Sequence, residues 1–153
     1  MQNYFIQLFG YDKWATTRLL EVFDQKPAVN PRINELLSHI QSAQRIWLDR
    51  CQGRKETVQR FQERTQQSIW SDMASCHKDW VAFIQSLQPA DFTRFISYTN
   101  FQGDHLTSML QDIITQVTNH GTHHRGNIIV LMKEEGFAPP NLDYISYVRQ
   151  QQG

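Results

Sequence analysis

Cysteine, glycine and proline are all scarce in this sequence. Its 153 residues include only two cysteines, seven glycines and five prolines. Two cysteines cannot form a framework of several disulfides, which excludes the small, disulfide-stapled domains of secreted proteins. A chain of this length buries enough apolar surface to fold without cross-links, so we expect it in the reducing cytoplasm.

The sequence also lacks a surplus of charge and a long apolar run. Lys and Arg together number 15, as do Asp and Glu, so the formal net charge is zero. Nucleic-acid surfaces and membrane-surface anchors usually need a basic surplus, so we expect neither partner. The longest apolar run, residues 128–132, is far too short to cross a bilayer, and the first residues do not resemble a signal peptide.

Apolar residues instead recur every three or four positions in four segments, which is the spacing of one buried helix face. This pattern predicts helices over residues 2–23, from 31 through Trp47, 70–87, and from Thr107 or Ser108 to 135. Asn30-Pro31 is typical of an N-cap followed by a first-turn proline. Gly136 is the expected stop of the last helix.

The segments between these helices are polar or only weakly patterned. We interpret residues 50–68 as mostly an exposed connection, and residues 92–103 as a short hairpin or an extended crossover. The tail, residues 141–153, is too short to be a domain. Four helices around one core predict an all-α fold, a four-helix bundle that forms a single domain over residues 1–153.

Two histidines interrupt the apolar face of the last predicted helix. His120 and His124 are four residues apart, so their side chains lie about 40° apart around the axis and one turn apart along it. Burying two imidazoles is costly unless each has a partner, and one metal ion would satisfy both. The alternative is that each ring hydrogen-bonds to a neighbouring polar group.

His39 favours the metal interpretation. It lies at the edge of the apolar face of the second predicted helix, where it can complete three ligands from two packed helices. Three neutral nitrogens leave coordination positions open, as in catalytic sites, and zinc, nickel and iron all accept imidazole. No cysteine is close to these histidines in sequence, which disfavours a thiolate-bound structural zinc.

Other polar residues near the pair have competing interpretations. His77 lies on the inward face of the third predicted helix. It could be a fourth ligand, but we favour a hydrogen-bonded core histidine. Gln116 and His123 are the candidate catalytic residues: Gln116 to reach a metal-bound water, and His123 to line the pocket. We expect His105 on the surface.

Two residues beside the pair need a local explanation. Gly121 costs about 1 kcal/mol relative to alanine inside a helix, which indicates that another group approaches closely or that helices pack tightly there. Arg125 is either an anion clamp at the pocket or part of a structural ion pair. We favour the ion pair, with Asp143 as its candidate partner.

Four stretches of the sequence carry a resemblance to a known family. They are Tyr11-Asp12-Lys13-Trp14-Ala15, Ser38-His39-Ile40 with Ala43-Gln44-Arg45-Ile46-Trp47, His120-Gly121-Thr122-His123-His124-Arg125-Gly126, and Pro139-Pro140 with Asp143-Tyr144. In these stretches the chain resembles the DinB/YfiT-like superfamily of metal-binding four-helix bundles. The resemblance implies that His39, His120 and His124 bind a divalent metal and that the protein is a homodimer.

The resemblance also implies a chemistry. Members with an assigned activity are mainly thiol S-transferases, so a small thiol and an electrophilic compound are the expected partners. The family name refers to induction by DNA damage, which implies a role in a stress response. Two alternatives stay open: a metal-dependent hydrolase, and a non-enzymatic metal-binding bundle that acts through contacts with a partner.

Overall fold

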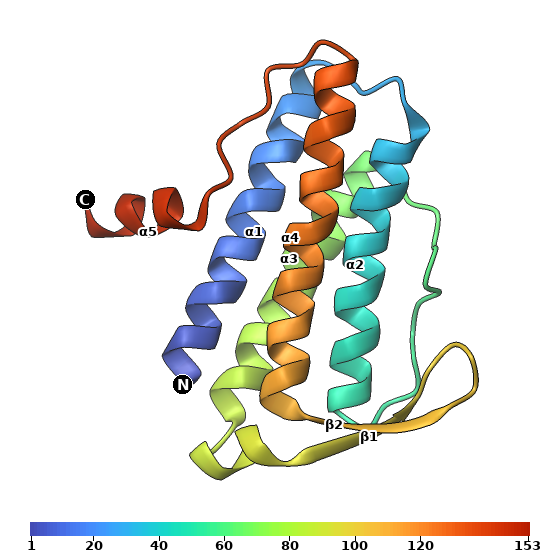
Figure 1. The fold of residues 1–153 in the computed structure, drawn as a ribbon, viewed down its shortest axis with the longest axis vertical. Coiled ribbons are helices and arrows are strands. Elements are labelled where there is room, and N and C mark those ends of the chain that lie inside the picture. The colour runs from blue at the N-terminus through green and yellow to red at the C-terminus, as the bar shows by residue number, and fades with distance from the viewer.

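The structure, a computed structural model that describes residues 1–153, is built around four long helices (Figure 1). These are α1 (Gln2–Gln25), α2 (Pro31–Cys51), α3 (Gln66–Ser86) and α4 (Leu110–Glu134). The 3₁₀ helix η1 (Pro89–Thr93), strands β1 (Phe95–Thr99) and β2 (His105–Met109), and the short helix α5 (Tyr144–Gln152) complete the fold. The predicted helical bundle is therefore confirmed. No helix is long and apolar enough to cross a membrane.

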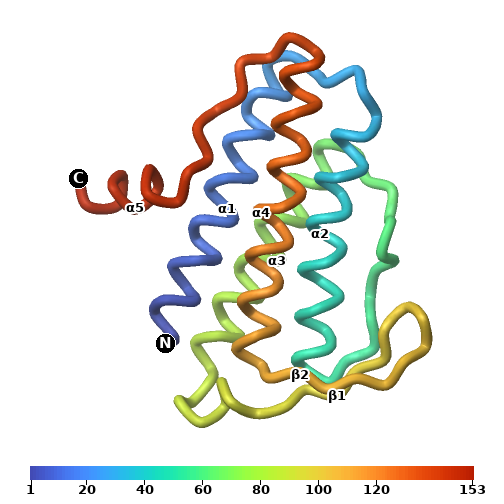
Figure 2. The backbone as a smooth tube through the Cα atoms, viewed as in Figure 1, coloured from blue at the N-terminus to red at the C-terminus, as the bar shows by residue number.

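Each long helix packs mainly against two others. The pairs α2–α4 and α1–α3 have the most extensive contacts, followed by α2–α3 and α1–α4. The helices therefore form a ring in the order α1, α3, α2, α4, which the backbone trace in Figure 2 lets the reader follow. As a result, α4 lies beside both α2 and α1, and its side chains can reach each of them.

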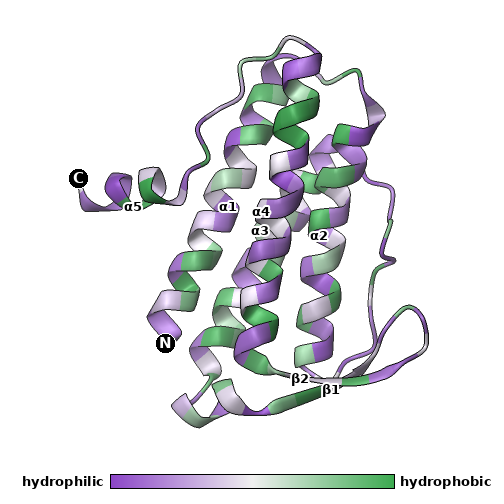
Figure 3. Ribbon diagram, in the orientation of Figure 1, coloured by the Kyte–Doolittle hydropathy of each residue, from purple (hydrophilic) through white to green (hydrophobic).

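Most buried apolar residues form two large clusters separated by a polar layer, and a third, small cluster contains Tyr11, Ala15 and Tyr147. One cluster contains Phe9, Trp80 and Val117, and the other contains Leu19, Ile40 and Ile128. Buried polar side chains of α1, α2 and α4 lie between them in sequence: Asp12, Thr16, Gln41, Ser42, Gln44, Thr118 and Arg125. Figure 3 shows the same change along α4, from a hydrophilic middle to a hydrophobic C-terminal part.

Several predicted boundaries agree with the structure. The Asn30 side chain accepts a hydrogen bond from the Arg32 amide at 2.9 Å and so caps α2. Gly136 follows α4 with a φ of +77°, a left-handed conformation that glycine adopts at little cost. Helix α3 begins earlier than predicted, because the Thr65 side chain caps it by accepting from the Ser68 amide.

The prediction that Thr107 or Ser108 caps the last helix is wrong. Both residues lie in β2, which pairs antiparallel with β1 in a register that sets Phe95 opposite Met109. The Leu110 amide donates to the Arg94 carbonyl at 2.9 Å, so the strand leads directly into α4. The hairpin, one of two interpretations of residues 92–103, is thus present but extends further along the chain.

The tail contains a helix that the sequence analysis did not predict. Helix α5 lies beside α1, outside the ring of four helices and roughly perpendicular to α1 (Figure 1), and Tyr147 packs against Tyr11, Trp14 and Ala15. The Tyr11 hydroxyl donates to the Leu142 carbonyl at 2.8 Å. Aromatic packing therefore holds this segment, although it is short and rich in glutamine.

Candidate metal centre

Three histidines from two helices meet at one point beside the polar layer. His39 of α2 faces His120 and His124 of α4, with ring centroids 5.0 and 4.8 Å away. One nitrogen atom of each ring lies within 4.8 Å of the others, and no carboxylate or thiol joins this group. The packing of α2 against α4 thus brings together the three residues that the sequence suggested as ligands.

The hydrogen bonds around the rings leave nitrogen lone pairs directed into the cluster. The His39 Nδ1 donates to the Arg60 carbonyl at 3.1 Å, so its Nε2 is free to bind a metal. The Nε2 atoms of His120 and His124 are 3.1 Å apart. Two nitrogens on one tetrahedral zinc would be about 3.3 Å apart, so the spacing of the pair fits a shared ion.

The alternative explanation for the pair, hydrogen bonds to neighbouring polar groups, finds no support. The only polar contact of His120 and His124 is with each other. The Nδ1 of His124 is buried without a hydrogen-bond partner. A hydrogen bond between the facing Nε2 atoms needs one of them to carry a hydrogen, whereas a shared ion would accept the lone pairs of both.

Burial keeps the three rings uncharged. Burial first, and then the neighbouring histidines, lower the pKa of His120 and of His124 to about 4. Burial also lowers the pKa of His39, although its hydrogen bond to the Arg60 carbonyl opposes the shift. All three imidazoles are therefore neutral near pH 7, which is the state that binds a metal ion.

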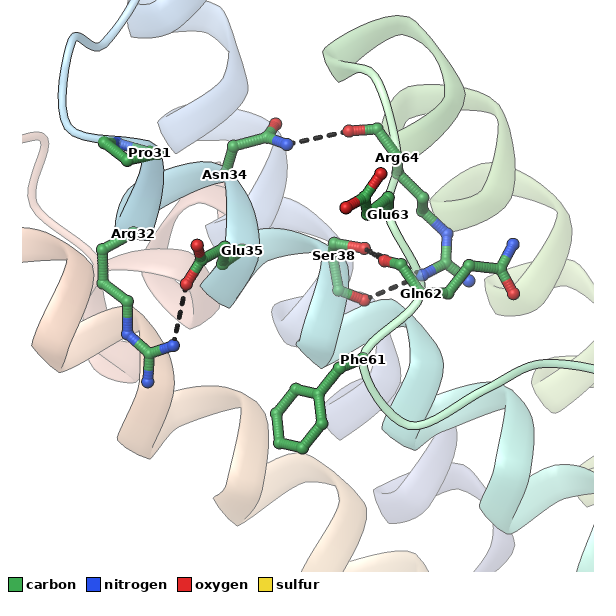
Figure 4. Close-up of a pocket in the computed structure, with 9 residues that line it drawn as sticks. All are labelled: Pro31, Arg32, Asn34, Glu35, Ser38, Phe61, Gln62, Glu63 and Arg64. Atoms are coloured by element: carbon green, nitrogen blue, oxygen red, sulfur yellow. Dashed lines mark hydrogen bonds and ion pairs between the residues drawn. The ribbon is translucent and has the colours of Figure 1, made fainter.

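The connection between α2 and α3 forms one wall of the site. Phe61 stacks on the His39 ring with centroids 5.0 Å apart and planes inclined by 19°. Figure 4 shows how the following residues are attached to α2: the Ser38 hydroxyl donates to the Gln62 carbonyl, and Arg64 donates to the Ser38 carbonyl at 3.0 Å. The connection is mostly exposed, as predicted, but Arg64 is buried, and the sequence did not indicate its contact with α2.

A cavity of about 590 Å³ opens beside this attachment. Its lining comes from the start of α2 and from the connection: Pro31, Arg32, Asn34, Glu35, Ser38, Phe61, Gln62, Glu63 and Arg64 (Figure 4). None of the three histidines lines this cavity, but Phe61 does, and its ring stacks on His39. The cavity therefore lies on the Phe61 side of the candidate ligands.

The other candidate residues lie at or beyond the edge of the cluster. His123 is exposed, with its ring centroid 5.0 Å from that of His124, and Gln116 is exposed one turn before His120. His77 is half-buried, lies outside the group and has an unpaired Nδ1, so it is neither a fourth ligand nor a fully hydrogen-bonded core residue. His105 is exposed in β2, as expected.

Arg125 forms an ion pair with Asp12 and not, as we predicted, with Asp143. Its Nη1 is 2.6 Å from the Asp12 Oδ1, and both side chains are almost fully buried. The Gln44 amide also donates to Asp12, so the network joins α1, α2 and α4. Asp143 instead occupies the N-cap position of α5. The cause is tertiary: α1 packs beside α4, whereas the tail lies outside.

Sequence reasoning also missed the role of Asp12, although a signal was present. Asp12 continues the buried face of α1 between Phe9 and Ala15, just as the histidines interrupt that of α4. Gly121 allows the contact. A β-carbon at Gly121 would lie 2.5 Å from the Asp12 Oδ1 and 3.0 Å from the Arg125 Nη1, so this position requires glycine.

Comparisons with known proteins agree with this architecture. The chain is 22% identical over 166 residues to "Protein DinB" of Bacillus subtilis strain 168, which covers 97% of this chain and 95% of that protein. The crystal structure of a DinB-like protein from Bacillus cereus ATCC 10987 is similar with a TM-score of 0.69 and 20% identity, over 90% of this chain and 94% of the other. The DinB family profile matches residues 1–153, and this chain therefore belongs to the DinB family.

Proposed function

We propose that this protein binds a divalent metal ion through His39, His120 and His124 and uses it to transfer a small thiol to an electrophilic compound. The observation that carries the proposal is the convergence of three neutral imidazoles from two helices. Zinc, nickel and iron are the candidate metals because each accepts nitrogen ligands. Three protein ligands leave a coordination position for a substrate, as in catalytic sites.

A metal in this site would lower the pKa of a bound thiol and hold the thiolate near its target. The chain's own residues prepare the place. The Arg60 carbonyl fixes the tautomer and orientation of His39, while one helical turn sets the spacing of His120 and His124. In the reaction, the thiol loses its proton to solvent, sulfur bonds to the electrophilic carbon, and the leaving group departs with the bonding electrons.

The composition of the cluster favours thiol transfer over hydrolysis. A metal-dependent hydrolase commonly uses a carboxylate as general base beside the bound water, and none belongs to this group. A thiol needs less assistance, because its own pKa is far below that of water. We keep His123, at the rim beside His124, as the candidate for contacting the electrophile.

The first test is metal content and its effect on rate. Protein purified without an affinity tag or chelator should contain about one metal ion per chain. It should conjugate cysteine, glutathione or bacillithiol to an electrophile faster than the same protein after chelation, and added metal should restore the rate. Equal rates with and without metal, across several electrophiles, would contradict the transferase and favour a non-enzymatic metal-binding bundle.

A further inference from the structure

Arg60 is an exposed arginine with no acidic partner, next to the three histidines. Its guanidinium carbon lies 5.0 Å from the ring centroid of Phe61 and 5.2 Å from that of Phe101. Its backbone carbonyl accepts the hydrogen bond from His39, which ties the position of Arg60 to that ring. Its charge also contributes to the lowered pKa of His39 and of His120, so it acts within electrostatic reach of the cluster.

The other arginines of this region are already engaged. Arg32 pairs with Glu35, Arg50 with Glu56, and Arg64 with Asp72. The guanidinium of Arg60 forms neither an ion pair nor a hydrogen bond within the chain. Most exposed arginines are merely solvated and mobile, but the two aromatic contacts restrict this one and present its edge to solvent.

Arg60 also lines an open cavity of about 600 Å³, together with Phe61, Phe101 and four residues of the connection, Lys55, Glu56, Val58 and Gln59. The Glu56 carboxylate is paired with Arg50, and Lys55 is a second cation at this cavity. The cavity lies between the connection from α2 to α3 and the turn of the β hairpin, which run beside each other in Figure 1. Phe61 belongs both to this cavity and to the wall of the metal centre, because its ring stacks on His39. Phe61 is therefore the residue that links this cavity to His39.

We propose that Arg60, flanked by Phe61 and Phe101, binds the carboxylate of a substrate whose reacting group lies at the three-histidine site. The guanidinium fork matches a carboxylate in shape and charge, and the two rings cover the apolar part of the ligand. This inference rests on the proposed function, because it assigns that site its substrate class. The carboxylate belongs either to the thiol or to the electrophile, and the experiment distinguishes these sources.

The test uses two matched pairs of compounds with zinc-loaded, full-length protein. The two thiols are N-acetylcysteine and its amide, which differ only in whether the thiol carries a carboxylate. The two electrophiles are iodoacetate and iodoacetamide, which differ only in whether the electrophile carries one. Binding of both thiols is measured by titration calorimetry, and kcat/KM is measured for each thiol–electrophile combination. The protein's own cysteines do not interfere, because burial raises the pKa of Cys51 and of Cys76 to about 12.

The variants are Arg60→Gln, Arg60→Lys and, as the matched control, Arg149→Gln. Arg149 is also exposed and without an ion pair, but it lies on α5 at the opposite side of the bundle from the connection (Figure 1). Zinc affinity is measured for every variant. It should not fall in Arg60→Gln, because only the backbone of Arg60 contacts His39 and loss of the nearby positive charge favours a bound cation.

We expect the wild type to prefer the acid over the amide about tenfold in one of the two pairs. Arg60→Gln should abolish that preference by lowering the affinity and kcat/KM for the acid alone. Arg60→Lys should retain part of the preference, and Arg149→Gln should match the wild type. A preference that is absent in the wild type, or unchanged in Arg60→Gln, overturns the inference but leaves the proposed function intact. If neither thiol binds the zinc-loaded protein, the proposed function fails, and the inference fails with it.

Discussion

An imidazole buried beside two others is far more stable uncharged, and this governs the behaviour of the candidate metal centre. Burial and mutual repulsion both lower the pKa of His120 and of His124. The Arg60 carbonyl fixes the hydrogen of His39 on Nδ1. Each ring therefore offers a lone pair without first losing a proton, and the three are organised for metal binding before an ion arrives.

The substitution His120→Ala should remove metal binding and turnover together. Loss of a supporting group around a metal ligand already costs 10–100-fold in affinity, so loss of a ligand should weaken binding by roughly 100-fold or more. Competition with a chelator of known affinity measures this. His105→Ala is the control, since His105 is exposed in β2, and it should change neither metal affinity nor rate. Wild-type affinity in His120→Ala would remove this residue from the ligand set.

The pH dependence of metal binding should follow the lowered pKa values. From the ordinary histidine pKa one would expect metal loss as the pH falls toward about 6. Because the pKa of His120 and of His124 is lowered to about 4, protons compete effectively with a metal only nearer that pH. Metal content after dialysis at pH 6 should therefore equal that at pH 7.5, and it should fall between pH 5 and pH 4.

The lowered pKa values of His120 and His124 also make the metal-free protein less stable as the pH falls. Below the ordinary pKa of 6.5 the histidines of the unfolded chain take up protons, whereas His120 and His124 of the folded chain do not until about pH 4. Unfolding therefore binds protons in this range, and stability falls as the pH is lowered through it. Thermal unfolding in the presence of a chelator should show a smaller pH dependence for His120→Gln than for the wild type.

At the scale of elements, residues 120–125 of α4 contact two helices, α2 and α1. His120 and His124 face α2, whereas Gly121 and Arg125 meet Asp12 of α1. The position of α4 against α1 thus depends on a buried ion pair that is adjacent in sequence to both ligands. Breaking such a pair leaves an uncompensated buried charge, so this contact strongly constrains how the helices pack.

Two glycines of α4 provide a matched test of that contact. Gly121→Ala should destabilise the protein by about 1–3 kcal/mol, because its methyl group would overlap the Asp12 carboxylate at 2.5 Å. Gly126→Ala should stabilise it by up to about 1 kcal/mol, since nothing lies within 4 Å of the added carbon and alanine favours the helix. Chemical denaturation measures both. Equal effects of the two substitutions would show that the close approach at Gly121 is unimportant.

At the scale of the whole molecule, the bundle has two apolar clusters with polar side chains between them. The clusters supply most of the hydrophobic stabilisation. Pairing satisfies part of the polar layer between them, since Asp12 accepts from both Arg125 and Gln44, whereas the buried side-chain amide of Gln41 has no hydrogen-bond partner in the chain. The three histidines lie beside this layer. Helix α2 supplies His39, α4 supplies His120 and His124, and Phe61 of the connection between α2 and α3 covers the His39 ring.

The homodimer implied by the family resemblance stays a prediction. Light scattering during gel filtration should give a mass close to twice the 18.0 kDa of one chain. The metal-free protein should give the same value, because the three candidate ligands all come from one chain. A mass of one chain at working concentration would contradict the dimer without affecting the metal centre.

The sequence by itself determined the features that depend on neighbours along the chain. The three-and-four spacing of apolar residues predicted the four helices, and local chemistry identified the cap at Asn30 and the stop at Gly136. The histidine pair was visible for the same reason, because residues four apart in a helix share a face. His39 was recognised as a candidate from its place at the edge of an apolar face, and the packing of α2 on α4 brought it to the pair.

Only the tertiary structure decided the features that depend on which helices become neighbours. Arg125 pairs with Asp12 and not with Asp143 because the ring order sets α4 beside α1, and no local pattern encodes that order. Residues 144–152 form a helix because aromatic side chains of α1 cover it. The polar connection forms a wall of the metal centre because Ser38 and Arg64 attach it to α2, which sets Phe61 on His39 and brings Arg60 beside it. Such contacts join residues far apart in sequence, so only the packed chain selects among the partners that each residue could take.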